Sequence, residues 1–580
     1  MSNNISTSNN KFFVLSEESS IEEIQNALRA DLMSGRVGGF VPVGDKTGVV
    51  TGVITDSDLR KMTNKLNKDP LVARDIMNRD FIYARSGASP LEIAKSILSD
   101  LNRREITNNF PITYIPVLFE NKALKSIAHI SEVLPILENL NREIIIIGQG
   151  FVGLTFSMAL VNSGIKIYAI EKSAETYNKI VAGTPSVYEP QLSEILERNL
   201  NKNYQITNKD LSEFKRKPMF CKRTYVIAVG TPHKDTKTDL SQIKSAIEIL
   251  SKNIEFGDLI VLRSTVPVGT TRNLVSKAIF TETGLQAGID YHLAYAPERT
   301  VEGNAILETR KLPQLISGLT PECTKAAINF FSEFVGSVVP CESLEACELA
   351  KLISNAYRDV VFGFANEVAQ IASRHNIDVN KLISDANTGY SRNAIPQPSP
   401  GVGGPCLTKD TYMIEGLKEP SVMLSARSLN KKMEEYSADL IKRAAEIYGN
   451  KILVIGLAFK GKPNTNDLRN SPSVEIVKKL VKAGFEVQAI DAIASNLEII
   501  RNGITPYESE KKPKFNPRLI AVLNDNDLNP DIFRNFIKNL DDNIDRSLFD
   551  PWCMVNDSDL PISFTLKFNL SKQFSFPRYK

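Results

Sequence analysis

Cys406 stands in a stretch rich in glycine and proline, Pro400-Gly-Val-Gly-Gly-Pro-Cys-Leu-Thr-Lys-Asp410. Most free cysteines in proteins are buried and inert, and that interpretation stays open for this one. The glycines, however, let a ligand approach the backbone, and Lys409 and Asp410 can adjust the proton affinity of the thiol. A thiolate can add to an aldehyde, and transfer of a hydride from the adduct to an oxidised nicotinamide then gives a thioester. These features make Cys406 a candidate covalent nucleophile.

Lys351 and Asn355 form a second group that could do chemistry. They lie four residues apart in a proline-free amphipathic run over residues 348–375, so they share one face of a helix. By spacing alone, such a pair is more commonly a solvated helix face.

A dinucleotide motif precedes both groups. Gly148-Gln-Gly150-Phe-Val-Gly153 follows the strand-like run at residues 143–148 and opens a helical stretch. Its glycines permit a tight turn, close approach of a pyrophosphate, and close packing of helix on strand. Glu171 ends the next strand and can accept hydrogen bonds from ribose hydroxyls, whereas it would repel a 2′-phosphate. The pattern therefore predicts NAD rather than NADP.

The elements that position these residues alternate between strand and helix. Five β-rich runs predict a buried parallel sheet, at residues 143–148, 165–171, 224–230, 258–265 and 291–297. Residues 345–448 are predicted to be mostly helical, with a loop at residues 396–405. The α/β pattern restarts at residues 450–553, and the polar residues after it are assigned no structure.

A weak repeat occupies the N-terminal part, where Phe40–Val43 and Gly52–Arg60 correspond to Tyr114–Val117 and Ser126–Leu134. Each copy reads as two strands followed by the start of a helix, which predicts a pseudo-symmetric pair.

Composition excludes several classes of function. The net charge is +3, from 70 basic and 67 acidic residues, so neither a nucleic acid nor an anionic membrane is expected as a partner. No apolar run approaches the ~18 residues that span a bilayer, and the polar start is not a secretory signal. Six cysteines without a CxxC pair and four scattered histidines predict neither disulfides nor a metal site. The cytoplasm is the expected location.

Seven stretches together resemble the UDP-glucose/GDP-mannose dehydrogenase family. They are GQGFVG (148–153), VGTP (229–232), STVPVGTT (264–271), APERTVEG (296–303), ELAKLISNAYRDV (348–360), GVGGPCLTKD (401–410) and GLAFKGKPNTNDLRNSP (456–472). The resemblance implies two Rossmann-like domains joined by a central long-helix domain that builds a homodimer. It also implies a four-electron oxidation of a sugar C6 alcohol to a carboxylate by NAD.

The expected domains follow from the resemblance and the repeat. They are a disordered tail (1–13), a CBS-domain pair (14–137), an NAD-binding Rossmann domain (141–335), a central helical dimerisation domain (340–448), a C-terminal UDP-sugar-binding Rossmann-like domain (449–555) and a tail (556–580).

The resemblance also assigns roles to single residues. Cys406 would form a thiohemiacetal and then a thioester, Lys351 and Asn355 would stabilise the oxyanion, and Asp410 would tune the thiol or orient water. Glu298 would be the general base for hydrolysis, and Thr265 would hold a catalytic water and contact the cofactor. The other cofactor contacts would be Gly148, Gly150, Phe151, Val152, Gly153, Glu171, Thr231 with Pro232, and Glu302. The substrate contacts would be Arg299, Lys351, Asn355, Arg392, Asn393, Gly403, Lys460 and Arg469.

The branch of the family sets the expected sugar. Pro297-Glu-Arg-Thr-Val-Glu-Gly303, Arg358-Asp359 and Ala365-Asn-Glu367 look like the branch that acts on UDP-N-acetylhexosamines, for surface polysaccharide precursors. The Lys409 position departs from many members of that branch. A UDP-glucose 6-dehydrogenase is the alternative within the class, and an inactive nucleotide sensor is the alternative outside it.

The N-terminal repeat resembles a pair of CBS domains. In that family, positions like Thr55 and Asp58 bind the ribose and phosphate of an adenine nucleotide. The second copy is degenerate, with Ser126 and Glu132 at the corresponding motif. A ligand-free structural pair is therefore the alternative.

Overall fold

The computed structural model describes residues 13–29, 38–62, 71–103, 113–130, 133, 142–216, 221–234, 237–508, 515–538, 540 and 543–575. The chain forms two compact units. One comprises Met1–Glu143 with Lys215–Arg223, and the other comprises Ile144–Phe214 with Thr224–Lys580. No helix within the described residues combines the length and apolarity that crossing a bilayer requires. The predicted disordered residues 1–12 lie outside the described ranges.

The N-terminal unit contains the predicted repeat. Two three-stranded sheets, β1-β2-β3 and β4-β5-β6, have the same order, and in each the first pair of strands is parallel and the second antiparallel. Both hairpins carry a register shift at the same place, between Val43 and Gly44 and between Val117 and Leu118. The elements are β1 Leu15–Ser16, α1 Ile21–Ala27, β2 Phe40–Gly44, β3 Val50–Thr55, α2 Asp56–Met62, α3 Ala73–Ile76, β4 Ala84–Arg85, α4 Pro90–Arg103, β5 Tyr114–Leu118 and β6 Leu124–His129. The motif position Glu132 of the second copy is outside the described residues.

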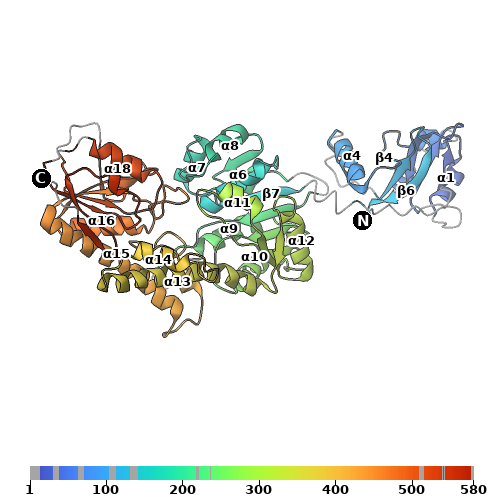
Figure 1. Ribbon diagram of the computed structural model, residues 1–580. Coiled ribbons are helices and arrows are strands. Elements are labelled where there is room, and N and C mark those ends of the chain that lie inside the picture. Colours follow the sequence, from blue (N-terminus) through green and yellow to red (C-terminus); the bar gives the residue numbers. More distant parts are fainter. Residues whose placement is uncertain are drawn as a thin grey trace. The chain divides into compact units, whose positions relative to one another are not determined.

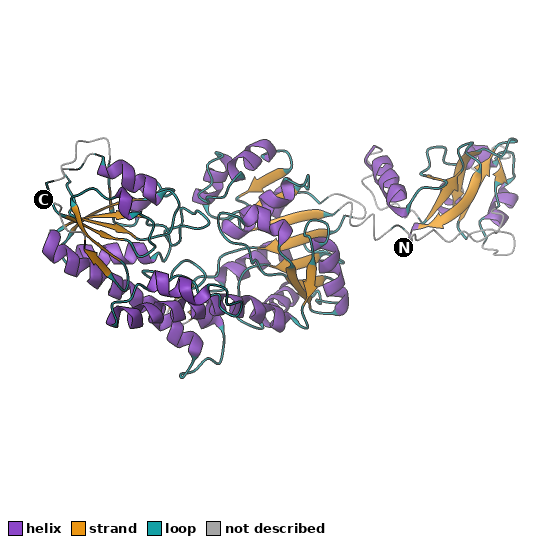
Figure 2. Cartoon of the chain, viewed as in Figure 1, coloured by secondary structure: helices purple, strands orange, loops and turns teal. Residues whose placement is uncertain are grey.

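The first domain of the larger unit is built on an eight-stranded sheet in the order β16-β15-β14-β13-β10-β7-β8-β9, with helices around it (Figure 2). Its elements are β7 Glu143–Ile147, α6 Phe151–Val161, β8 Ile167–Ile170, α7 Ala174–Val181, α8 Leu192–Asn199, β9 Tyr204–Thr207, β10 Arg223–Ile227, β11 His233–Lys234, β12 Lys237–Thr238, α9 Ser241–Ser251, β13 Leu259–Leu262, α10 Lys277–Thr283, β14 His292–Tyr295, α11 Ala305–Lys311, β15 Gln314–Gly318, α12 Pro321–Phe331 and β16 Val338–Pro340.

All five predicted strands are present, and the pairings β7–β8, β10–β13 and β13–β14 are parallel. The sheet is not parallel throughout, because β14 pairs with β15 in the antiparallel direction. The chain first winds to one side, from β7 to β8 and β9, and then returns to the other side of β7 with β10. The carboxyl ends of β7 and β10 therefore flank a topological switch point, where α/β sheets bind ligands.

The central helices are α13 Leu344–Arg374, α14 Val379–Asn387 and α15 Val422–Tyr448. Ser343 caps α13 by accepting a hydrogen bond from the Ala346 amide, and no proline interrupts the helix that follows. The helices α13 and α15 lie side by side (Figure 1), and a Cβ at Gly363 would lie 2.9 Å from the Cβ of Ala426. Glycine thus allows the two helices to pack closely. The predicted loop at residues 396–405 is confirmed and lies between α14 and α15.

The C-terminal domain has a seven-stranded sheet in the order β19-β18-β17-β20-β21-β22-β23. Its elements are β17 Lys451–Ile455, α16 Pro472–Lys482, β18 Glu486–Ile490, α17 Asn496–Arg501, β19 Thr505–Pro506, β20 Leu519–Val522, α18 Asn529–Ile537, β21 Arg546–Phe549, β22 Phe564–Phe568 and β23 Gln573–Ser575.

The strands β22 and β23 correct the expectation that residues 556–580 have no structure. The strand β22 pairs with β21 in parallel, and Phe568 and Leu570 are buried in the domain core. Phe564, Leu566, Phe568 and Leu570 alternate with polar residues, which is a strand pattern that the prediction did not use.

Candidate active site

The glycine motif forms the predicted turn at the carboxyl end of β7. Gly148 has a φ of 91°, which glycine adopts without strain. A Cβ at Gly153 would lie 1.8 Å from the Gly148 carbonyl oxygen, so only glycine allows α6 to start there. Gly150 is the N-cap of α6, and a Cβ on it would meet nothing within 4 Å. The turn is therefore open above the positive end of the helix, which fits a dinucleotide pyrophosphate.

Glu171 lies beside this turn at the end of β8. Its carboxylate accepts hydrogen bonds from the amides of Gln149 and Ser173, each at 2.7 Å. These bonds fix the carboxylate next to the turn, and a carboxylate has further lone pairs for ribose hydroxyls. Val152 instead packs against the core under the sheet.

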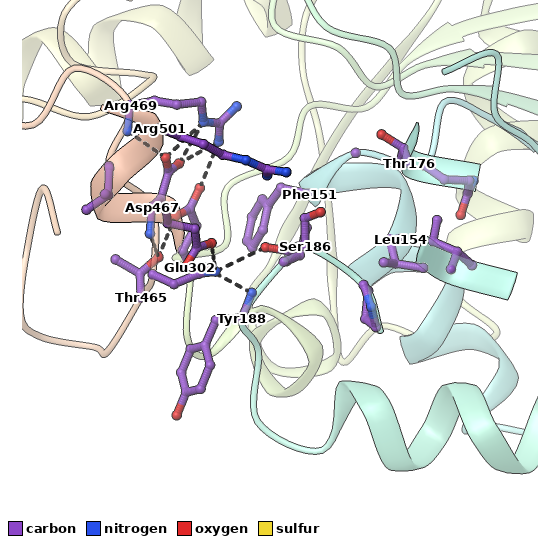
Figure 3. A pocket seen from close by; sticks show the side chains of 18 of the residues that line it. Phe151, Leu154, Thr176, Ser186, Tyr188, Glu302, Thr465, Asp467, Arg469 and Arg501 are labelled. Carbon is purple, nitrogen blue, oxygen red and sulfur yellow. Dashed lines mark hydrogen bonds and ion pairs between the residues drawn. The ribbon is translucent and has the colours of Figure 1, made fainter. Parts of the chain in front are cut away.

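A cleft of about 360 Å³ extends from the glycine turn to the C-terminal domain. In Figure 3, Phe151, Leu154 and Thr176 line one side, while Glu302, Asp467 and Arg469 lie together on the other. The remaining lining residues are Gln149, Gly150, Ile180, Pro185, Ser186, Val187, Tyr188, Thr465, Asn466, Leu468, Glu498, Arg501 and Asn502.

Glu302 ties the first domain to the C-terminal domain. Its carboxylate accepts a hydrogen bond from the Thr465 hydroxyl at 3.1 Å and lies 3.7 Å from Arg469, and its carbonyl accepts one from Lys460 at 2.6 Å. Burial, followed by the nearby Asp467 carboxylate, raises the pKa of Glu302 to about 7. Burial also lowers the pKa of Lys460 to about 8.

Cys406 is exposed, and charged residues surround it. Desolvation by the neighbouring protein, and next the Asp410 carboxylate, raise the pKa of its thiol, whereas Lys351 and Lys409 lower it. Lys351 is buried on α13, and no hydrogen bond or ion pair engages its ammonium within the described part of the chain. One cation is thus left available beside the thiol.

Asp410 is the buried anion of this group. Asn355 donates a hydrogen bond to its Oδ2 at 2.6 Å, and the Lys409 ammonium lies 3.3 Å from its Oδ1. The predicted residues Lys351, Asn355, Cys406 and Asp410 are therefore brought together, although they come from two segments more than fifty residues apart.

Lys409 also connects the loop that carries Cys406 to the first domain. We call this loop, residues 396–409, the cysteine loop. Its ammonium donates to the Thr231 hydroxyl at 3.4 Å, and that hydroxyl donates to the Thr265 carbonyl at 2.7 Å. A second cleft of about 630 Å³ lies here, lined by Thr231, Pro232, His233, Pro405, Thr408, Lys409, Tyr412, Arg469 and Asn470. The cysteine loop therefore faces the carboxyl end of β10, at the switch point.

His233 and Tyr412 are among the residues of this second cleft that were not predicted. The rings of His233 and Tyr412 stack with centroids 5.8 Å apart and an angle of 14°. They are 179 positions apart in the sequence, so nothing in either local pattern linked them.

The cysteine loop is pinned to the C-terminal domain through its glycines. A Cβ at Gly403 would lie 2.1 Å from the Asn470 carbonyl oxygen, and a Cβ at Gly404 would lie 2.6 Å from the Phe459 ring. The Gly404 amide donates to the Asn470 carbonyl at 3.1 Å. Gly403 therefore serves close packing of the loop, which is a reason for glycine that the sequence did not reveal.

Glu298, which the resemblance assigns as the general base, has a carboxylate with several protein partners. Its carboxylate forms a buried ion pair with Arg263 and accepts hydrogen bonds from the amides of Arg299 and Thr300, both at 2.8 Å. Burial alone would raise the pKa of Glu298, but Arg263 and these hydrogen bonds lower it overall. In this conformation Glu298 is a fixed anion, and Arg299 is exposed near Cys341.

The expected substrate contacts after α14 lie outside both clefts. Arg392 stacks over the Tyr390 ring at 5.1 Å, and the Asn393 side chain donates to the Ala386 carbonyl at 3.0 Å. Both contacts are local, so they order this segment.

Thr55 and Asp58 of the N-terminal unit form hydrogen bonds with each other. The Asp58 carboxylate accepts from the Thr55 hydroxyl at 2.6 Å and from the Thr55 amide at 3.0 Å, which closes the start of α2. This arrangement is stable without a ligand.

Comparison with known proteins is consistent with this geometry. Residues 142–335 match the NAD binding domain of the UDP-glucose/GDP-mannose dehydrogenase family, residues 345–432 its central domain, and residues 453–527 its UDP binding domain. Residues 5–64 match the CBS domain.

Two curated relatives illustrate the match. The UDP-N-acetyl-D-mannosamine dehydrogenase of Pyrococcus horikoshii is 30% identical over 355 residues, covering 60% of this chain and 83% of the relative. The NDP-N-acetyl-D-galactosaminuronic acid dehydrogenase of Ralstonia nicotianae is 32% identical, covering 59% and 80%.

Solved structures agree. The UDP-D-ManNAc dehydrogenase structure from Pyrococcus horikoshii aligns with a TM-score of 0.64 and 26% identity, covering 74% of this chain and 99% of that structure. The UDP-N-acetyl-mannosamine dehydrogenase Cap5O from Staphylococcus aureus aligns with a TM-score of 0.61 and 26% identity, covering 74% and 98%.

Proposed function

Since the chain belongs to the UDP-glucose/GDP-mannose dehydrogenase family and carries its NAD binding domain, we propose that it oxidises C6 of a UDP-N-acetylhexosamine to the carboxylate. The observation that carries the proposal is the group formed by Cys406, Lys351, Asn355 and Asp410 at the switch point of the NAD-binding sheet. A dehydrogenase that stopped at the aldehyde would not need a cysteine there. An inactive sensor would have no reason to keep the whole group.

The glycine turn fits NAD, with Gly150 and the start of α6 for the pyrophosphate and Glu171 for the ribose. Bound NAD would supply the oxidising power by taking up hydride from C6. Phe151 and Leu154 line the same cleft and would exclude water from its apolar side.

Cys406 is proposed to add to the carbonyl carbon of the aldehyde, which forms a C–S bond and an alkoxide. The Lys351 ammonium and the Asn355 amide are proposed to stabilise that alkoxide, because they lie on one face of α13 beside the thiol. After oxidation to the thioester, water would attack its carbonyl carbon, and the C–S bond would break to release the carboxylate and the thiol.

Two carboxylates are candidates for the base of this hydrolysis, Glu298 and Glu302. Glu298 would first have to leave Arg263, since that ion pair and two amides occupy its carboxylate. Glu302 is the alternative base, because its pKa of about 7 suits proton transfer near neutral pH.

The sugar is proposed from the relatives. The proteins named above act, by their names, on N-acetylated hexosamine nucleotides, and two of the residues typical of that branch, Asp359 and Asn366, are buried in the central domain here. Lys460 and Arg469 would face the nucleotide from the C-terminal domain. We further propose that the reaction takes place in the cytoplasm and supplies surface polysaccharide precursors.

We also propose a homodimer interface and a regulatory nucleotide site. The exposed apolar residues along α13 would form a homodimer interface. They are Leu349, Ile353, Tyr357, Phe364 and Ile371.

The N-terminal CBS unit would bind an adenine nucleotide at Thr55 and Asp58 and regulate the enzyme.

The test is NADH production by the purified protein with a panel of UDP-sugars and GDP-mannose, with the product mass recorded. We expect that one UDP-N-acetylhexosamine is oxidised and that about two NADH form per sugar, as oxidation to the acid requires.

The variant Cys406→Ala should form no acid, and full acid production by that variant would refute the thioester route. If UDP-glucose is the only sugar oxidised, the alternative function, that of a UDP-glucose 6-dehydrogenase, is supported instead. If the protein binds NAD but oxidises no sugar, whether or not AMP or ATP is present, the inactive nucleotide sensor is supported.

A further inference from the structure

A buried guanidinium joins the two ends of the cysteine loop. Arg427, on α15, donates a hydrogen bond to the Val402 carbonyl at 2.7 Å and another to the Leu407 carbonyl at 3.3 Å. Cys406 lies between these two carbonyls in the sequence. The side chain of Arg427 is 4% exposed, so water does not compete for these hydrogen bonds.

Arg427 is itself held by residues of α13 and α15. Asp359 accepts a hydrogen bond from its guanidinium at 2.9 Å, and Asn430 donates to the same Asp359 oxygen at 2.7 Å. Asn366 then donates to Asn430 at 2.9 Å and accepts from the Ser399 amide at 2.8 Å. This buried network therefore starts and ends on the segment that carries Cys406.

Other hydrogen bonds hold single points of the loop: the Ser437 hydroxyl donates to the Pro400 carbonyl at 3.0 Å, and the Thr408 hydroxyl donates to the Gly404 carbonyl at 2.8 Å. The loop contains no strand or helix between residues 388 and 409, and Gly403 and Gly404 give its backbone wide conformational freedom. Its other side is pinned to the C-terminal domain by Asn470. A planar guanidinium with several fixed donors is suited to hold two carbonyls at a set spacing, which an ammonium cannot do.

We propose that Arg427 is a positioning residue for the nucleophile: by bridging the Val402 and Leu407 carbonyls, with Asp359 and Asn430 orienting it, it sets the position of the Cys406 thiol. The role given to the thiol rests on the proposed function. The bridging itself concerns the loop and can be tested without turnover.

The first test is Arg427→Lys, which keeps the charge beside Asp359 but cannot bridge both carbonyls. Hydrogen exchange of the peptide spanning residues 400–410 should become about tenfold faster, because the loop opens more often. The rate at which iodoacetamide alkylates Cys406 should change, while that of the exposed Cys553 should not. Misplacement of the thiol should lower kcat by about ten- to a hundredfold. The KM for NAD should stay within about twofold, since the glycine turn is intact.

Arg443→Lys is the matched control. Arg443 is exposed on the same helix, so its substitution should change none of these values. If Arg427→Lys does not fold, the double variant Arg427→Met/Asp359→Leu removes both buried charges and takes its place. Unchanged exchange and alkylation in a folded variant would overturn the proposal. If the wild type oxidises no UDP-sugar, the proposed function fails, while exchange and alkylation still decide on Arg427.

Discussion

At the scale of single residues, the charges around Cys406 act on its thiol in opposite directions. Desolvation and Asp410 raise the pKa of the thiol, and Lys351 and Lys409 lower it. Lys409 is already engaged with Asp410 and Thr231, whereas Lys351 has no such contact among the described residues. Lys351 is therefore the cation best placed to favour the thiolate.

We predict that Lys351→Met raises the pKa of Cys406, because the variant loses a positive charge that stabilises the thiolate. At pH 8 the alkylation of Cys406 by iodoacetamide should slow by about three- to tenfold, which corresponds to half to one pKa unit. Mass spectrometry of the Cys406 peptide over a range of pH measures the shift. Lys478→Met, at an exposed position of α16, is the control, and an unshifted profile for Lys351→Met would contradict the prediction.

At the scale of elements, α13 has two functional faces. One face is buried and carries Lys351, Asn355 and Asp359 towards the cysteine loop. The other face exposes large apolar side chains, with Ile353 44% and Tyr357 68% accessible. An apolar row along a helix of 31 residues is typical of a surface that another chain covers.

We predict that Ile353→Glu dissociates the proposed dimer, since a carboxylate in an apolar interface would lose its hydration without a partner. Sedimentation velocity at micromolar concentration should give a monomer for this variant and a dimer for the wild type. Ile447→Glu is the control, because Ile447 is also an exposed isoleucine, in the last turn of α15. A wild type that sediments as a monomer, or a variant that remains a dimer, would count against this interface.

At the scale of the whole larger unit, Glu302 couples the contact between the first and last domains to pH. Its folded-state pKa of about 7 lies above the usual glutamate pKa of 4.5. The folded protein therefore holds this proton more tightly than the unfolded chain does. This contribution to stability is complete below the unfolded pKa and is lost as the pH rises through about 7.

We predict that Glu302→Gln, which cannot ionise, removes this part of the pH dependence. Between pH 5 and pH 8 the Tm of the wild type should fall more than that of the variant, by an amount equivalent to about 1–2 kcal/mol. Thermal unfolding followed by circular dichroism over this range provides the comparison. Glu446→Gln, at an exposed position of α15, should behave like the wild type. Parallel curves for wild type and Glu302→Gln would rule the coupling out.

The sequence by itself determined the elements whose pattern is local. The five β-rich runs, the glycine turn before α6 and the proline-free run of α13 were all predicted, because apolar periodicity and glycine spacing act within one element. The N-terminal repeat was visible for the same reason. The family resemblance then linked Cys406, Lys351, Asn355 and Asp410, which no local pattern connects.

The tertiary structure alone decided which groups meet across the chain. It paired β22 with β21 and β23 with β22, and it brought Glu298 into an ion pair with Arg263. It also brought Arg427 under the cysteine loop. Such contacts depend on how distant segments pack, and burial makes them strong, so residue type and spacing do not reveal them.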